Sequence, residues 1–208
     1  MGEICTAQVQ AEYLQRMGEE VGALCFELRE EVDWLRSKWL EFRELFAKGP
    51  ARIELLNTVA SNFFCFLNKL LFEDGMLHLC RLTDPPGKAR QENLTVCRLA
   101  YLITEPKSKF PKQVRQGVDE AVAKCEFARR WRNKRLAHSD LASLRGKSVS
   151  PFPEVTAKNI EEAVNSIDKL LASVERHYDI QKPLLAPDPF GARSLLSYLG
   201  VARAERRV

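Results

Sequence analysis

Residues 14–50 read LQRMGEEVGALCFELREEVDWLRSKWLEFRELFAKGP, and their apolar side chains recur at alternating steps of three and four. This spacing places one apolar stripe along a helix of roughly 40 residues. Gly18 or Gly22 is expected to bend the helix, and Gly49-Pro50 is a helix stop. The stretch therefore predicts a long N-terminal helix that packs on another long helix, either of this chain or of a second copy.

The rest of the chain also has helical periodicity. Five further segments show it: about 52–82, 94–104, 112–138, 156–178 and 195–204. Asn93 and Thr156 are the expected N-caps of the second and the fourth of these. With no strand pattern, the sequence predicts an all-α bundle of four to five main helices with a short C-terminal helix. We expect one helical domain over residues 1–180 and a tail over 181–208 that packs on or near it.

The composition is that of a soluble globular protein, with 45% hydrophobic and 29% charged residues in 208. No uninterrupted apolar run approaches eighteen residues, so we expect no membrane-spanning segment and no membrane partner. The first twenty residues lack the basic region and apolar block of a secretory signal, which predicts a cytoplasmic location. The six cysteines and three histidines lack zinc-site spacing, so we expect free thiols, no metal and no cofactor.

The segment 52–82 contains charged residues in an apolar row. Its predicted inward stripe consists of Ile53, Leu56, Ala60, Phe63, Leu67, Leu70 and Leu77. Continuing that spacing places Asp74 and Arg81 in the row, with His78 beside both. Opposite charges at core positions must pair or line a site, because an unpaired buried charge is very costly. A scaffold ion pair and a component of a functional site both remain open as interpretations.

A dense basic segment follows in the chain. Residues 124–147 carry eight bases against two acids, which suits a phosphate-bearing partner. Within it, Arg132 offers a planar fork to phosphate oxygens and His138 can exchange a proton near neutral pH. RNA cleavage without a metal needs this pair of groups. Arg132 and His138 would converge only if the helix ends or distorts near His138, or if a second subunit supplies the complementary residue. The alternative interpretation is that His138 caps the helix or packs against it.

Two blocks of the sequence are similar to one known family. Residues 127–141, FARRWRNKRLAHSDL, and residues 71–86, LFEDGMLHLCRLTDPP, resemble the HEPN superfamily (higher eukaryotes and prokaryotes nucleotide-binding), in its abortive-infection AbiU branch of phage defence. HEPN ribonucleases share an arginine, commonly a polar residue next, and a histidine after four to six intervening residues. Here those positions are Arg132, Asn133 and His138, and the likeness extends roughly from Trp34 to Tyr178.

The resemblance implies a homodimer whose two arginine–histidine motifs face a shared cleft and cut RNA without a metal. Arg132 would hold the scissile phosphate, His138 would transfer the proton, and Asn133 would orient phosphate or ribose. The substrate-binding candidates are Arg129, Lys134 and Arg135. The supporting candidates, to which the resemblance assigns no firm role, are Asp140, Asp74, His78 and Arg81.

The leading hypothesis is a metal-independent endoribonuclease of phage-defence or toxin type that cleaves RNA by 2′-OH attack at a dimer-interface cleft. Its expected partners are RNA, a second copy, and an antitoxin or the product of a neighbouring gene. The alternative is a non-catalytic HEPN module, either a dimerising partner of another enzyme or a nucleotide- or RNA-binding scaffold. A third hypothesis is a simple nucleic-acid-binding protein, which would show salt-dependent affinity without cleavage.

Overall fold

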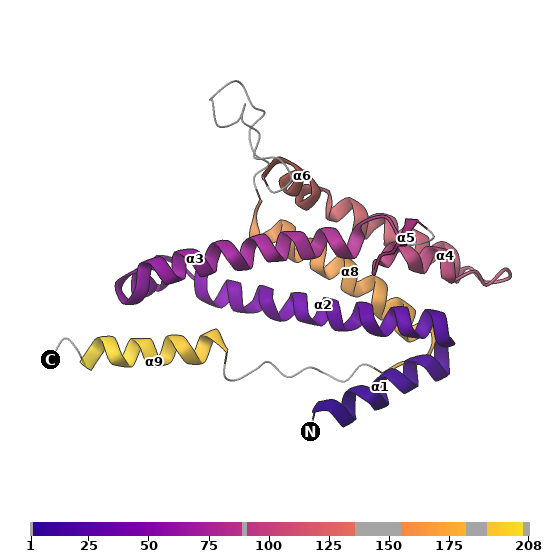
Figure 1. Cartoon of the computed structure of the whole chain (residues 1–208), viewed down its shortest axis with the longest axis horizontal. Helices are drawn as coiled ribbons and strands as arrows, with labels where there is room; N and C mark the ends of the chain where they lie inside the picture. Colours follow the sequence, from indigo (N-terminus) through magenta and orange to yellow (C-terminus); the bar gives the residue numbers. More distant parts are fainter. Residues whose placement is uncertain (1, 89–90, 136–154, 182–190, 206–208) are drawn as a thin grey trace, which may run out of the picture. The chain divides into compact units, whose positions relative to one another are not determined.

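The computed structural model describes residues 2–88, 91–135, 155–181 and 191–205 (Figure 1). The α-helices are α1 Gly2–Met17, α2 Glu19–Phe46, α3 Pro50–Thr83, α4 Leu99–Leu102, α5 Phe110–Lys124, α6 Glu126–Arg135, α8 Ala157–His177 and α9 Ala192–Glu205. A 3₁₀ turn, Val96–Arg98, precedes α4. The two-residue strands β1 Gly87–Lys88 and β2 Gln91–Glu92 pair antiparallel. The predicted all-α class is confirmed, and the small ribbon is an unforeseen addition.

The chain divides into two compact units. Unit 1 contains Met1–Asp33 and Met76–Lys182, and unit 2 contains Trp34–Gly75 and Pro183–Val208. Helices α2 and α3 therefore each contribute one part to each unit. The division into a domain over 1–180 and a tail over 181–208 stays a prediction.

A glycine divides the predicted N-terminal helix into α1 and α2. Gly18 has a φ of +80°, a left-handed conformation that ends α1 at the residue before it. Gly22 lets the start of α2 approach α1 closely, because a Cβ at Gly22 would lie 2.5 Å from the Tyr13 carbonyl oxygen. The predicted bend at these glycines is confirmed, but the single helix was wrong. The stop at Gly49-Pro50 is also confirmed, since Gly49 has a φ of +106° and α3 begins at Pro50.

Two glycine substitutions test this account of the α1–α2 turn. We expect Gly22→Ala to lower the free energy of unfolding by about 1–3 kcal/mol, because backbone atoms of α1 must move away. Gly75→Ala is the matched control: it lies inside α3 with nothing within 4 Å of the added Cβ. That change should stabilise the protein by about 0.5–1 kcal/mol. Urea unfolding curves measure both, and equal stability of the two variants would contradict the close approach.

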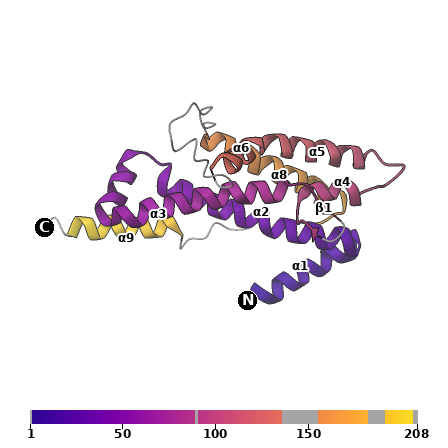
Figure 2. The same ribbon diagram turned by 45° about the horizontal axis from the view of Figure 1, so that its top comes forward.

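The core of unit 1 is built around α5 and α8, which lie side by side (Figure 2). Val114 of α5 and Ile167 of α8 are fully buried. Thr156 caps α8, as predicted, and the structure adds a capping box with Asn159. The predicted cap Asn93 was wrong: its amide donates to the Pro85 carbonyl and closes the loop after α3. Thr95 caps the 3₁₀ turn instead, accepting from the Cys97 backbone N–H.

The segment predicted as one helix over 112–138 contains two helices within its described residues. α5 ends at Lys124 and α6 begins at Glu126, with Cys125 between them at φ −92° and ψ 0°. The thiol of Cys125 is fully buried. Ala128 and Trp131 are buried as the periodicity predicts, so the break redirects the helix without changing the residues that face inward.

The predicted inward stripe of α3 was wrong in its phase. Ala60 has φ −160° and ψ 70°, which is not helical, and the kink changes which residues share a face. Phe63 and Leu70 are 60% and 55% exposed, although both were predicted to face the core. Leu56 is buried as predicted, and it shares the core of unit 2 with Leu45, Phe64, Ala192 and Leu196. The predicted C-terminal helix, observed as α9, supplies the last two of these.

Candidate functional site

Helix α6 positions the basic residues that the sequence analysis selected. Ala128 is fully buried and Trp131 is 6% exposed, so these two side chains fix the helix on unit 1. Arg129 and Arg132 each follow one of these anchors by one residue and lie on the adjoining face. Both guanidinium groups are consequently held close to the protein surface and do not extend freely into solvent.

The carboxylate of Asp84 forms ion pairs with both Arg129 and Arg132. The Arg132 Nη1 donates a 2.8 Å hydrogen bond to Asp84 Oδ2, and the Arg129 Nε lies 3.8 Å from Asp84 Oδ1. Asp84 directly follows the end of α3 and precedes Pro85-Pro86. Sequence reasoning did not select Asp84, although it lies in the second family-like block, at the point where a helix stops before paired prolines.

Arg129 is mainly a structural clamp. Its Nη2 donates to the Thr83 carbonyl at 2.7 Å and lies 2.9 Å from the Thr83 hydroxyl. Its Nη1 donates to the Val122 carbonyl at 3.1 Å. These bonds tie the end of α3 to α5 and α6, and they leave the Arg129 side chain only 16% exposed.

Hydrogen bonds also fix the backbone on which Asp84 is mounted. The Thr95 hydroxyl lies 2.7 Å from the Asp84 carbonyl oxygen and 3.0 Å from that of Leu82. The Thr83 hydroxyl donates to the Leu79 carbonyl at 2.7 Å. The Asp84 carboxylate therefore has a fixed place from which it orients Arg132.

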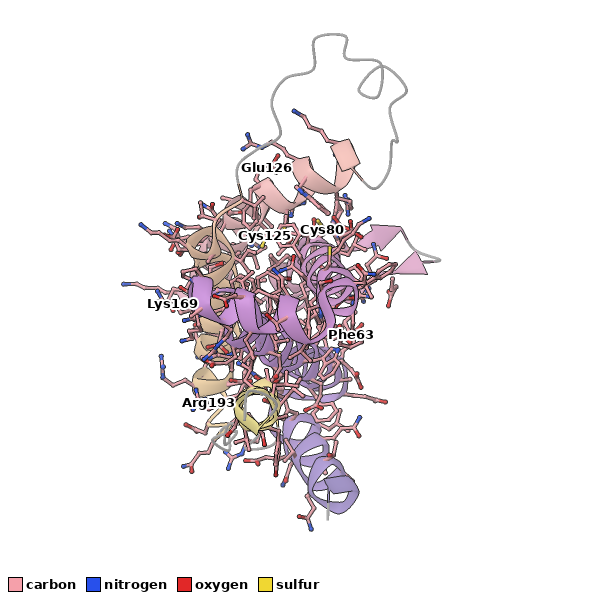
Figure 3. The ribbon with its side chains drawn as sticks, turned by 90° about the vertical axis from the view of Figure 1, so that its left-hand side faces the viewer. Phe63, Cys80, Cys125, Glu126, Lys169 and Arg193 are labelled. Carbon is pink, nitrogen blue, oxygen red and sulfur yellow. The ribbon has the colours of Figure 1, made fainter. Side chains whose placement is uncertain are left out.

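The electrostatics of this cluster keep Arg132 charged. Partial burial lowers the pKa of Arg132, but the hydrogen bond that Arg132 donates to Asp84 and the negative charge of that carboxylate outweigh this, and the net pKa lies above the usual value. Nearby, burial raises the pKa of Cys80 to about 11 despite the opposing arginines, so this thiol is neutral at pH 7. Cys80 and Cys125 are labelled below α6 in Figure 3.

A comparison with known protein families shows which family the chain belongs to. The family model HEPN_AbiU2, described as AbiU2, matches residues 18–191. The chain belongs to the AbiU2 family of HEPN proteins. The match includes both blocks that carried the resemblance, and with them Asp84 and Arg132. No curated protein matches the chain. No solved structure matches it either.

Of the other candidate site residues of this AbiU2-family chain near Arg132, only some lie within the described part of the structure. Asn133 is exposed and Lys134 is half-buried on α6. Arg135 ends α6, and only its backbone is described. His138 and Asp140 lie outside the described residues. The structure thus brings Arg132 and Arg129 together at Asp84, whereas the pairing of Arg132 with His138 stays a prediction.

The expected charged row on α3 was wrong. His78 is fully buried, and its Nε2 lies 2.7 Å from Glu31 Oε2. Arg81 is 64% exposed and lies 3.8 Å from the same oxygen. Asp74 belongs to unit 2, where its half-exposed carboxylate pairs with Lys38. Glu31 of α2, and not a neighbour on α3, is therefore the acidic partner of both His78 and Arg81.

Part of this row lies beside the Arg132 cluster. A surface hollow of about 290 Å³ is lined by Glu31, Arg81, Leu82, Asp84, Asn93 and Leu94. Arg81 and Asp84, which both come from the second block of the family motif, thus border one hollow in unit 1. Among the described residues, no group of three or more metal-ligating side chains comes together.

Proposed function

We propose that this AbiU2-family protein is a metal-independent endoribonuclease of phage-defence or toxin type. The observation that carries the proposal is the Asp84–Arg132 ion pair. It fixes the guanidinium on α6 while leaving the Arg132 side chain 29% exposed. Arg132 would be the phosphate-binding arginine of the HEPN motif that this chain resembles, and the chain matches the family over residues 18–191.

In the proposed reaction the ribose 2′-oxygen attacks the adjacent phosphorus. The 2′-O–P bond forms as the bond from phosphorus to the 5′-oxygen breaks, which yields a 2′,3′-cyclic phosphate and a 5′-hydroxyl. Arg132 stabilises the negative charge on the phosphorane oxygens, and His138 removes the 2′-OH proton or protonates the leaving 5′-oxygen. The hydrogen bond that Arg132 Nη1 donates to Asp84 orients the guanidinium, whose planar fork then binds the phosphate.

Neighbouring residues would complete the site. Asn133 would orient phosphate or ribose, and Lys134 and Arg135 would attract the RNA backbone. Arg129 would act through the clamp it forms with Thr83 and Asp84. The proposed setting is a cytoplasmic homodimer with RNA in the shared cleft and no cofactor. An antitoxin or the product of a neighbouring gene would restrain the activity.

The same ion pair also supports a second candidate function, a non-catalytic HEPN module. Asp84 forms an ion pair with Arg132, and Arg129 donates hydrogen bonds to the carbonyl oxygens of Thr83 and Val122. Arginines engaged in this way also suit a scaffold that binds a partner enzyme or RNA without cutting it. Binding without cleavage separates this candidate from the nuclease.

A cleavage assay in EDTA tests the proposal. Purified protein is incubated with mixed cellular RNA and tRNA, beside Asp84→Asn and the charge-removing control Lys158→Ala, whose side chain is 82% exposed on α8. We expect EDTA-resistant cleavage by the wild type and the control, and a rate about 10-fold lower for Asp84→Asn because Arg132 is no longer aimed. Equal rates in all three would place the site elsewhere, and no cleavage of any RNA would favour the non-catalytic module.

A further inference from the structure

The hollow beside Asp84 combines apolar and charged side chains in a small space. It has a volume of about 290 Å³ and lies within unit 1. Leu82 and Leu94 supply its apolar part, and Leu94 is 38% exposed, so this side chain is available to a ligand. The volume is near the lower end of the range of about 300–1,000 Å³ that small-molecule pockets occupy. The hollow therefore suits one flat ring system rather than a longer ligand.

The Glu31 carboxylate is held in place at this hollow from the protein interior. His78 is fully buried, and its Nε2 lies 2.7 Å from Glu31 Oε2. The Glu31 side chain is nevertheless 39% exposed. Its ion pairs with His78 and Arg81 both involve Oε2, so a ligand can bind through Oε1 without displacing His78. Glu31 is thus an oriented acceptor for N–H groups.

Arg81 places a hydrogen-bond donor next to this acceptor. Its side chain is 64% exposed, and its Nη2 lies 3.8 Å from Glu31 Oε2. A separation of 3.8 Å is too long for a hydrogen bond, so the two groups attract each other while the guanidinium can still donate to a ligand. The charged edge of the hollow therefore offers a donor beside a carboxylate.

This donor–acceptor pattern is complementary to the Watson–Crick edge of guanine. That edge presents the O6 acceptor, then the N1–H and N2–H donors. Arg81 would donate to O6, and the two oxygens of Glu31 would accept from N1–H and N2–H. In adenine and uracil the same placement sets the second carboxylate oxygen against an acceptor atom, and in cytosine it meets no second N–H group. Guanine is the base that satisfies both oxygens.

The hollow adjoins the proposed phosphate site through a shared residue. Asp84 lines the hollow and accepts the 2.8 Å hydrogen bond from Arg132 Nη1. A base in the hollow would consequently lie one side chain away from the guanidinium that binds the phosphate in the proposed reaction. In RNA a base and its phosphate are joined through a single ribose, so one nucleotide can occupy both places.

We propose that the hollow is a subsite for a guanine base next to the scissile phosphate. Glu31 and Arg81 bind the Watson–Crick edge of the base, and Leu94 packs on its apolar face. A base that uses this edge for the protein cannot be paired, so the substrate class is RNA with an unpaired guanosine at the cut. The inference rests on the proposed function for cleavage itself, but the binding of guanine can be tested without cleavage.

Nucleotide titration tests the subsite directly. The full chain is titrated in a calorimeter with the 3′- and 5′-monophosphates of guanosine, adenosine, cytidine and uridine, which carry the phosphate on either side of the nucleoside. We expect one of the guanosine phosphates to bind about 10- to 100-fold more tightly than the matching phosphates of the other three nucleosides. Equal affinities for all four bases, or binding of none, would overturn the inference.

Inosine monophosphate assigns the guanine preference to Glu31. Inosine differs from guanosine only in lacking the N2 amino group, so the wild type should bind it about 10-fold more weakly. Glu31→Gln should abolish this difference, because an amide cannot accept from two N–H groups. The matched control is Glu30→Gln, which removes the same charge from the neighbouring exposed residue of α2 and should retain the difference. A difference that persists in Glu31→Gln would overturn the inference.

Arg81→Ala gives a second variant in case Glu31→Gln fails to fold. Arg81 is 64% exposed, so its removal should leave the melting temperature unchanged. Adenine presents an N–H donor where guanine presents O6, and we therefore expect Arg81→Ala to lower the preference for guanosine over adenosine phosphate about 10-fold. A wild-type preference in Arg81→Ala would contradict the proposed contact with O6.

Mapping of cleavage sites separates failure of the subsite from failure of the nuclease. A random-sequence RNA is cut in EDTA and the fragment ends are sequenced. We expect guanosine to be enriched at one position beside the cut for the wild type and Glu30→Gln, but not for Glu31→Gln. Cleavage without a base preference would overturn the inference and leave the nuclease intact. Guanosine-selective binding by a chain that cuts no RNA would support the subsite and contradict the nuclease.

Discussion

We expect Arg132→Lys to lower the rate of RNA cleavage in EDTA by about 100-fold or more, although the substitution keeps the positive charge. Lysine is a compact point charge that retains an ion pair with Asp84 but lacks the planar fork that binds two phosphate oxygens. Removal of one such charge-stabilising contact typically costs 10²–10³ in rate. His138→Ala should lower the rate by about 10²–10⁴, because proton transfer is lost. Initial rates on a fluorescent RNA measure both effects.

The control for Arg132 is its neighbour Arg130. Arg130→Lys changes the same side chain on the same helix, but Arg130 is 64% exposed and pairs with Glu126 one turn away. We expect Arg130→Lys to cleave RNA at the wild-type rate. The melting temperatures of Arg132→Lys, His138→Ala and Arg130→Lys should all equal that of the wild type. A wild-type rate in Arg132→Lys would remove Arg132 from the reaction. A large loss of melting temperature in His138→Ala would instead indicate a packing histidine.

Arg29→Met should lower the free energy of unfolding by about 3–5 kcal/mol. Arg29 is 4% exposed, and its Nε and Nη2 donate to the Glu175 carboxylate at 2.6 and 2.8 Å. Its Nη1 donates to Asp168 at 2.7 Å. Removing one partner of a buried ion pair leaves an uncompensated charge in the interior, which is the costly outcome. The network ties α2 to α8, and the Tyr13 hydroxyl joins α1 by donating to Glu175 at 2.7 Å.

A double-mutant cycle isolates this pair. Arg29→Met combined with Glu175→Leu removes both charges, so the double variant should lose less stability than the sum of the two single variants. Arg16→Met breaks the exposed pair with Glu12 and should change the urea midpoint little. Additive losses in the cycle, or an Arg29→Met curve that overlays the Arg16→Met curve, would contradict the buried network.

The helical fold could be predicted because its signals are local. Apolar periodicity, the left-handed Gly18 and Gly49, and the Thr156 cap are all visible in short stretches of sequence. The kink at Ala60 could not be predicted from the sequence, because alanine favours the helix and no neighbouring residue indicates its non-helical backbone angles. The stripe extended across Ala60 was therefore out of phase. The break at Cys125 was missed for the same reason, since no Gly or Pro marks it.

The candidate site depends on contacts that the sequence does not display. Arg132 could be selected because its motif is contiguous, whereas Asp84 lies 48 residues earlier and meets it only in the folded chain. Glu31 likewise comes from α2 to meet His78 of α3. A charged residue in an apolar row predicts that a partner exists, but only the packing of helices identifies that partner.

The chemistry of the RNA ends tests the central claim most directly. Cleavage products formed by the wild-type protein in EDTA are separated, and their termini are identified by mass spectrometry and by labelling with a kinase. The account predicts a 2′,3′-cyclic phosphate on the upstream fragment and a 5′-hydroxyl on the downstream fragment, both absent with His138→Ala. A 3′-hydroxyl with a 5′-phosphate, or RNA that stays intact, would contradict it.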